Sequence, residues 1–284
     1  MSFPQTRHTL IQRIAGAGDE GDWRQFFADY WGPICRFARR GGSLTPDDAE
    51  DVASQTFEAL VRNRLLTQWV LTRSAKLRTL LCAVVRNVLS NRARVLAGRA
   101  RLLRDHGGRL DDRGALPLVT SLDAPAEQVD AFYAAWVEDL LQQAVEALCA
   151  HYHREGKGDF FRVLYGRLCD AMTTSEIARD LDITVSQAEN AFKDARKRLA
   201  RRLEDLVRDH VGRYCAPEDV EGQFTAEWGQ LGEYLKSHGG LEGAVRRAYE
   251  GLPTAPRAKH LSASMRAALT RVAEWLRRPD SPNA

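Results

Sequence analysis

Apolar side chains recur along this chain at intervals of three and four residues, and no run of alternating β-branched residues interrupts the pattern. One long segment carries such a stripe at Leu77, Leu80, Leu81, Val84 and Val88. These intervals place side chains on one face of an α-helix, whereas strands alternate with a period of two. We therefore expect an all-α fold in which each helix buries one face.

The first hundred residues carry the signals of a compact helical domain, within residues 1–105. In "DWRQFFADYWGPICRFARR" aromatic residues stand at helical spacing, and Pro33 is expected to kink or divide the helix. The next helix should begin after Thr45, an N-cap residue that is followed by proline and by acids in the first turn. A third helix, from about Ser74, becomes rich in arginine toward its C-terminal end.

Two helix-start signals stand eleven residues apart in "MTTSEIARDLDITVSQAENAF". Thr173 with Glu176, and Thr184 with Gln187, both fit the capping-box pattern. Each is followed by an apolar face, and these faces comprise Ile177, Ala178 and Leu181, then Val185, Ala188 and Phe192. Two short helices with a tight turn and a shared core predict a helix-turn-helix, and an ordinary helical hairpin is the alternative.

The remaining boundaries follow from breaks in the helical pattern. Residues 106–130 contain scattered Gly and Pro and are expected to form a linker between the first domain and a helix-turn-helix domain at 131–212. Residues 213–284 predict a helical C-terminal extension with a regulatory role, which packs on the helix-turn-helix domain or receives a signalling partner. Its last helix carries an apolar stripe that suits ordinary packing or partner binding, formed by Leu261, Met265, Leu269, Val272, Trp275 and Leu276.

Charge is distributed unevenly, although the formal net charge is only +3. The segment 43–60 holds five acidic residues and no Lys or Arg, whereas 86–109 holds seven arginines and one acid. An acidic patch followed by a basic one indicates two different partners, or else two solvated helix faces.

Several other features bear on the compartment of the protein. The five cysteines are scattered and odd in number, which suits a reducing cytoplasm better than a disulfide framework. The sequence has no apolar run of the length a membrane span needs, and its first residues lack the pattern of a secretory signal. We therefore expect a cytoplasmic protein with no membrane partner.

Four segments, in this order, resemble the extracytoplasmic-function group of bacterial RNA polymerase sigma factors, within the sigma-70 superfamily. "DYWGPICRFARR" is similar to the opening of a subgroup with long linkers, and "DDAEDVASQTFEAL" to the acidic helix of region two. "KLRTLLCAVVRNVLSNRAR" is similar to the promoter-melting helix of the family. "SEIARDLDITVSQAENAFKDARKRLARRL" is similar to its region-four helix-turn-helix. The likeness covers roughly residues 3–210.

The resemblance implies a transcription initiation factor that binds RNA polymerase core and promoter DNA, and that is not an enzyme and uses no metal or cofactor. It implies polymerase binding through the acids of region two, Asp47, Asp48, Glu50 and Asp51. It implies contacts to the −10 element from Arg86, Asn87, Asn91, Arg92 and Arg94. It implies contacts to the −35 element from Thr184, Ser186, Gln187, Asn190, Lys193, Arg196 and Lys197. An anti-sigma factor or another signalling regulator is a further candidate partner.

Two alternatives remain beside this interpretation. The chain departs from the family pattern at Asn91 and on the expected reading helix at Glu189 and Asp194, which favours a degenerate sigma-like regulator that binds DNA or a partner without initiating transcription. A metalloprotein or enzyme is the other alternative, because "CAHYH" places Cys149 and His153 four residues apart. A structural zinc site needs four ligands, so this pair alone is insufficient.

Overall fold

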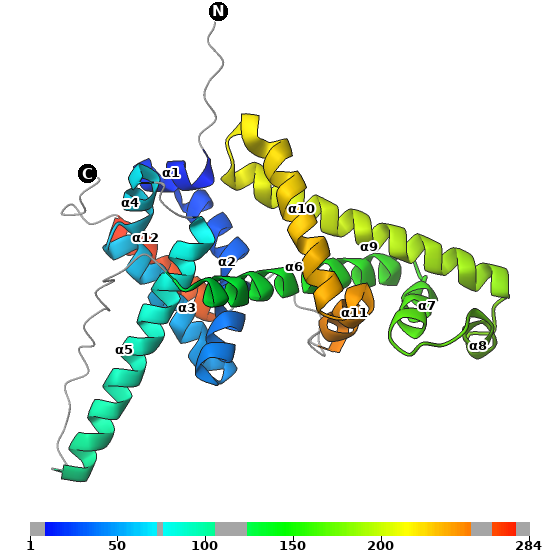
Figure 1. Cartoon of the computed structure of the whole chain (residues 1–284), viewed down its shortest axis with the longest axis horizontal. Coiled ribbons are helices and arrows are strands. Elements are labelled where there is room, and N and C mark those ends of the chain that lie inside the picture. The colour runs from blue at the N-terminus through cyan, green and yellow to red at the C-terminus, as the bar shows by residue number, and fades with distance from the viewer. Residues whose placement is uncertain (1–8, 73–75, 106–123, 251–262, 277–284) are drawn as a thin grey trace, which may run out of the picture. The chain divides into compact units, whose positions relative to one another are not determined.

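In the computed structural model, the residues described are 9–72, 76–105, 124–250 and 263–276, and they form helices and no strands (Figure 1). The chain divides into two compact units, which comprise the described residues 9–136 with 263–276, and 137–250. No helix of the described residues is long and apolar enough to cross a membrane. The expected all-α fold is therefore confirmed.

The first unit is built on α2 and α3. Its helices are α1 (Leu10–Ala17), α2 (Glu20–Gly42), α3 (Pro46–Arg62), α4 (Leu65–Thr72), α5 (Leu77–Asp105) and α12 (Ala263–Leu276), together with the start of α6 (Ala126–Arg154). Ser43 ends α2 in the left-handed conformation at φ 49°, and the side chain of Thr45 accepts the backbone N–H of Asp48 to begin α3. The N-cap predicted at Thr45 is thus confirmed.

Aromatic rings fill the space between these two helices. The ring of Phe57 on α3 is fully buried and stacks on Phe27 of α2, with 3.8 Å between the ring centroids. Trp31 stacks on Phe57 at 6.0 Å, and Phe26 meets it edge-on at 5.6 Å. Pro33 lies buried inside α2, which continues to Gly42, so of the two expectations, a kink or a division of the helix, the division is wrong.

The second unit consists of short helices packed on one long helix, α9. Its members are the remainder of α6, then α7 (Gly158–Leu168), α8 (Thr174–Asp180), α9 (Val185–Tyr214), the 3₁₀ turn η1 (Pro217–Asp219), α10 (Val220–Ser237) and α11 (Gly240–Glu250). Helix α9 contacts α7, α8 and α10, and its buried residues form a single stripe, Ala188, Ala191, Ala195, Leu199, Leu203, Val207 and Val211. Small alanines near its start let α7 and α8 approach α9 closely.

The two compact units do not coincide with the expected domain boundaries. Helix α6 begins at Ala126, inside the expected linker 106–130, and belongs to the first unit as far as Trp136. The expected extension 213–284 also divides, because α10 and α11 pack with the second unit, whereas α12 packs on α3 and α2 of the first. Helix α12 packs on the first unit because one of its faces is apolar; its buried residues are Met265, Ala268 and Val272. Leu261 and residues 106–123 lie outside the described residues.

We predict that Phe57→Ala lowers the free energy of unfolding of the first unit by about 3–5 kcal/mol, because it empties a fully packed aromatic site. Urea denaturation followed by tryptophan fluorescence measures the effect. Leu71→Ala is the control, since Leu71 is 81% exposed and its truncation should change stability by less than about 0.5 kcal/mol. Equal losses in the two variants would contradict the central role of the Phe57 site.

Candidate nucleic-acid interface

Two reciprocal capping boxes fix the starts of α8 and α9. The Thr173 hydroxyl accepts the Glu176 N–H at 3.2 Å, and the Glu176 carboxylate accepts the Thr173 N–H at 2.7 Å. Thr184 and Gln187 repeat the arrangement at 3.2 and 2.8 Å. Both predicted capping boxes are therefore confirmed, and each satisfies backbone donors that a helix start leaves unpaired.

The turn between α8 and α9 is tight and left-handed at one residue. Asp182 has φ 52°, a conformation that Asp tolerates better than most residues, and the Ile183 N–H donates to the Ala178 carbonyl at 2.9 Å. A small core holds the two helices against α7, formed by Val163, Ile177 and Ala191, with Phe160, Met172, Leu181, Ile183 and Phe192 packed around it. Helices α8 and α9 are therefore joined by a tight turn and share a small core with α7.

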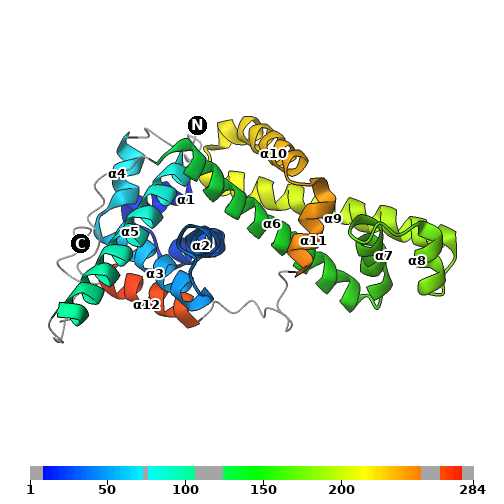
Figure 2. The ribbon, with the colours of Figure 1, turned by 60° about the horizontal axis from the view of Figure 1, so that its bottom comes forward.

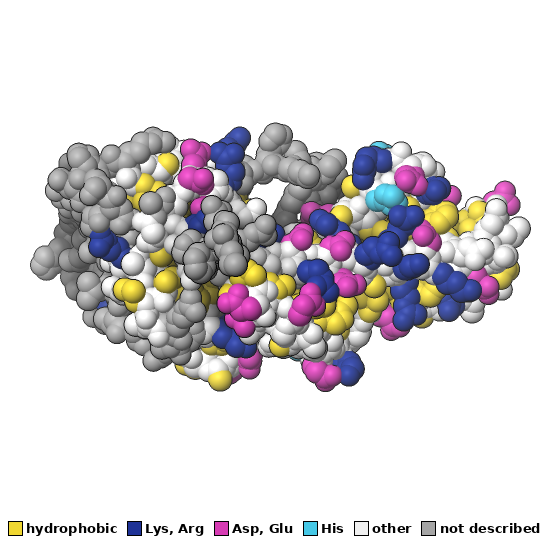
Figure 3. Space-filling model, turned by 90° about the horizontal axis from the view of Figure 1, so that it is seen from above, with side chains coloured by type: hydrophobic (Ala, Val, Ile, Leu, Met, Phe, Trp, Pro, Cys, Tyr) yellow, Lys and Arg dark blue, Asp and Glu magenta, His cyan; other side chains and the backbone are white. Residues whose placement is uncertain are grey.

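The solvent side of α9 is polar and becomes basic along its length. Opposite the buried stripe lies a set of exposed residues that we call the polar stripe, formed by Ser186, Glu189, Asn190, Lys193, Arg196 and Lys197. Figure 3 shows Lys and Arg side chains gathered over the region where Figure 1 places α9, with acidic side chains among them. Five of the residues expected to face DNA, namely Ser186, Asn190, Lys193, Arg196 and Lys197, therefore share one exposed face.

Gln187 is held differently from Asn190. The carboxamide oxygen of Gln187 accepts both the N–H and the hydroxyl of Thr184, at 2.8 and 2.9 Å. A bidentate pair with adenine uses the oxygen as an acceptor for the base and the nitrogen as a donor. While its oxygen caps α9, Gln187 can offer only its N–H groups, so Asn190 is the better placed of the two for such a pair.

Asp194, an acid on an otherwise basic segment, is half-buried on the side of α9 that contacts α6. Its carboxylate accepts the Tyr152 hydroxyl at 2.9 Å and Arg198 Nε at 2.8 Å. Burial acts to raise the pKa of Asp194, but the hydrogen bonds from Arg198 and Tyr152 together outweigh it, and its pKa lies below the ordinary value. Asp194 thus joins α9 to α6, which accounts for an acid at this position.

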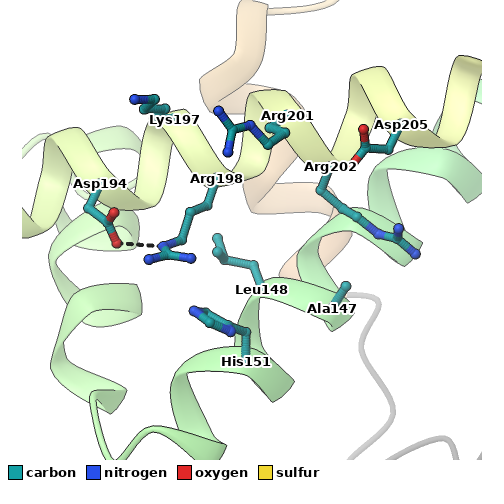
Figure 4. A pocket seen from close by; sticks show the side chains of 9 residues that line it. All are labelled: Ala147, Leu148, His151, Asp194, Lys197, Arg198, Arg201, Arg202 and Asp205. Atoms are coloured by element: carbon teal, nitrogen blue, oxygen red, sulfur yellow. Dashed lines mark hydrogen bonds and ion pairs between the residues drawn. The ribbon is translucent and has the colours of Figure 1, made fainter.

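A basic cleft of about 370 Å³ lies between α6 and α9 (Figure 4). Arg198 and Arg202 extend from α9 to either side of Leu148, while Lys197 and Arg201 lie along the outer side of the helix. The other residues that line the cleft are Ala147, His151, Asp194 and Asp205. Arg198 pairs with Asp194, and Asp205 offsets one of the three remaining cations, Lys197, Arg201 and Arg202, so the lining keeps an excess of positive charge.

The sequence alone did not indicate Tyr152, Leu148 or the cleft itself. The spacing of Asp194 and Arg198, an i to i+4 pair, was the available signal for an ion pair on α9. No spacing rule links Tyr152 to Asp194, which stand 42 residues apart. The cleft continues the basic surface of the polar stripe, with which it shares Lys197.

The residues quoted from "CAHYH" do not converge on a metal site. Burial, and then the nearby Glu146 carboxylate, raise the pKa of the Cys149 thiol to about 11, which disfavours the thiolate that binds metals. His153 is exposed. Among the described residues, no group of three or more His, Cys, Asp or Glu side chains is arranged to hold a metal ion.

In the first unit, the expected polymerase-binding acids lie on α3 and the expected −10 contacts on α5. Asp47 and Asp51 are exposed, Glu50 is half-buried, and Asp48 forms an ion pair with Arg92 of α5. The Thr45 hydroxyl, with help from Arg92, holds the pKa of Asp48 below its ordinary value. Two residues expected to contact different partners therefore bind each other.

On α5, four other expected contact residues reach the surface to different extents. Arg94 is exposed, whereas Arg86, Asn87 and Asn91 are half-buried. Asn87, Asn91 and Arg94 follow one another at intervals of four and three residues, so they share a face of the helix.

Comparisons with family models, with curated proteins and with solved structures each found no match for this chain. What the chain does is therefore argued from its own geometry.

We predict that Tyr152→Phe destabilises the second unit at pH 7 by about 1 kcal/mol, through loss of its hydrogen bond to Asp194. The folded-state pKa of Asp194 is depressed, so the stabilisation is present above the ordinary carboxyl pKa and is lost as pH falls through the depressed value. The difference between the wild type and the variant should therefore narrow as pH falls through the depressed pKa of Asp194. Thermal unfolding across this pH range measures it.

Tyr165→Phe is the control, because it also removes one hydroxyl from a tyrosine of the second unit; Tyr165 is half-buried, whereas Tyr152 is buried. Its effect on stability should be smaller and should not disappear at low pH. A pH-independent penalty for Tyr152→Phe would contradict the assigned bond to Asp194.

Proposed function

We propose that this chain is a transcription initiation factor of the sigma type, which binds RNA polymerase core and directs it to promoters through its two helical units. The observation that carries the proposal is the capped helix-turn-helix of α8 and α9 with the polar stripe on its exposed side. The proposal predicts separate tasks for α3, α5 and α9. It involves no catalysis by the chain itself.

The polar stripe supports contact with duplex DNA. A helix fits the major groove, where Asn can pair with adenine and Lys or Arg can reach guanine. Ser186 and Asn190 are neutral donors and acceptors near the start of α9, and Lys193, Arg196 and Lys197 follow on the same face. Because base contacts specify and phosphate contacts position, we assign Asn190 to base reading and Arg196 to the backbone.

The face of α5 supports a second DNA contact. Asn87 and Asn91 offer hydrogen-bonding groups, and Arg86 and Arg94 offer positive charge, on a helix that is firmly anchored by its buried N-terminal half. Arginine side chains neutralise phosphates and release counterions, which gives a salt-sensitive attraction. In the proposal this face holds the −10 element.

The acids of α3 support a protein partner with a basic surface. Asp47 and Asp51 are exposed on a helix whose opposite side is packed around Phe57. Complementary charge fixes the orientation and the rate of association more than the affinity. In the proposal that partner is RNA polymerase core.

A second function is favoured by Glu189 and by the Asp48–Arg92 pair. Glu189 is exposed within the polar stripe, where its charge repels phosphates unless its carboxylate accepts a hydrogen bond from a cytosine. The ion pair joins Asp48, an expected polymerase contact, to Arg92, an expected DNA contact, so each neutralises the charge of the other. Both features suit a sigma-like regulator that binds DNA or a partner without initiating transcription.

We predict that Arg196→Ala weakens binding to DNA fragments of every sequence and reduces the slope of log affinity against log salt by about one. Fluorescence anisotropy at several salt concentrations measures both. Lys236→Ala removes one charge from the end of α10, where Lys236 pairs with Glu233, and should leave the slope unchanged. A loss confined to one DNA sequence would contradict the assignment of Arg196 to phosphates.

We predict that Asn190→Ala changes sequence preference by about 1–3 kcal/mol at one base pair without lowering the melting temperature, because Asn190 is exposed and lies outside the capping box. Gln187→Ala should lower the melting temperature as well, since it removes half of the box that begins α9. Selection from a randomised DNA pool, with thermal unfolding beside it, separates the two effects. An unchanged preference in the Asn190 variant would assign base reading elsewhere.

The function itself is tested by mixing the purified chain with RNA polymerase core at low salt and following co-elution, then transcription from genomic fragments. The proposal predicts a salt-sensitive complex and defined transcripts. A complex that gives no transcript from any fragment would favour the second function. Absence of a complex at low salt would reject the proposal.

A further inference from the structure

Helix α12 packs against α3 and α2, although about 200 residues of sequence separate it from them (Figure 2). Met265, Ala268 and Val272 follow at intervals of three and four and are buried in this contact. Leu269 and Leu276 lie beside Trp23 of α2. The apolar stripe predicted for the last helix is therefore a packing face within the first unit.

The contact has a polar edge at Arg271. Arg271 Nε donates to the Glu58 carboxylate at 2.5 Å, and its Nη2 donates to the Ser54 hydroxyl. Ser54 and the carboxylate of Glu58 are mostly covered, whereas the side chain of Arg271 remains 48% exposed. One cation of α12 thus satisfies two polar groups of α3.

Those two groups belong to a longer acidic face of α3. Asp47, Asp51, Ser54 and Glu58 follow at intervals of four, three and four, so they lie on one side of the helix. Arg271 occupies the Ser54–Glu58 end of this face, whereas Asp47 and Asp51 at the other end are exposed. We call this side the acidic face of α3.

We infer that the acidic face of α3 is an interaction surface for a basic, partly apolar segment of RNA polymerase core, and that α12 occupies part of this surface in the same chain. This inference rests on the proposed function. Helix α12 brings to α3 an arginine flanked by apolar side chains, and a polymerase segment of the same chemistry would bind α3 in the same way. A partner that uses Glu58 must displace Arg271, so α12 and the partner compete.

The strength of the α12 contact suits reversible covering. Three buried side chains of modest size hold α12, beside the partly buried Leu269 and Leu276. The ion pair adds little, because exposed pairs of this kind contribute about 0–1 kcal/mol. A partner that binds only the uncovered state has its apparent affinity reduced by the uncovered fraction. If α12 covers the face in nine molecules of ten, its release raises the affinity about tenfold.

The experiment compares Arg271→Glu with Arg266→Glu in the full chain. Both variants make the same charge change on α12, but Arg266 is exposed and does not touch the acidic face. Hydrogen exchange of residues 47–58 and 263–276 reports the covering, and titration with fluorescent polymerase core reports affinity. Val272→Asp is a second disruption through the apolar contact, with circular dichroism as the check that the remaining helices stay folded.

The inference predicts that Arg271→Glu and Val272→Asp increase exchange in both segments and raise the affinity for core about tenfold, whereas Arg266→Glu changes neither. Because α12 and RNA polymerase core compete, binding of the polymerase to the wild type must also increase hydrogen exchange in residues 263–276.

Two kinds of result would overturn the inference that α12 and RNA polymerase core compete for the acidic face of α3. Increased exchange with unchanged affinity, or unchanged exchange in both disrupted variants, would reject competition while the proposed function stands. Failure of the wild type and of every variant to bind core at low salt would reject the proposed function, and the competition with it.

Discussion

The start of α9 at Thr184 determines which side chains the second unit presents to its partners. Successive residues of a helix are rotated by about 100°, so a start displaced by one residue would turn the polar stripe toward the core. The capping box of Thr184 and Gln187, with Asp182 in the left-handed turn before it, prevents such a displacement. The stripe of alanines and leucines on the buried side confirms the same register from within.

The same constraint explains how a helix with many charges can be both structural and available for binding. Arg198 and Asp194 lie on the side of α9 that faces α6, where they bind each other and Tyr152. Arg196 and Lys193 lie on the other side, in solvent. Charge along this segment is therefore sorted by helix face, and counting basic residues overstates what is available to DNA.

Local signals in the sequence predicted much of this structure, and contacts between distant segments account for most of what they missed. The caps at Thr45, Thr173 and Thr184 depend on neighbouring residues only, and all three are present. Helix α4 was not predicted, since its eight residues are too few to give a clear period. The packing of α12 on α3 and the bond from Tyr152 to Asp194 join segments far apart in sequence, and no pattern within either segment specifies its partner.

The most direct test of the account is to map transcription start sites in cells that overproduce the wild-type chain, beside cells that overproduce the Arg196→Ala variant. The account predicts a set of new start sites preceded by common sequence elements at fixed spacing, with weaker use of all of them in the variant. Production of stable protein that occupies DNA but creates no new start site would contradict it.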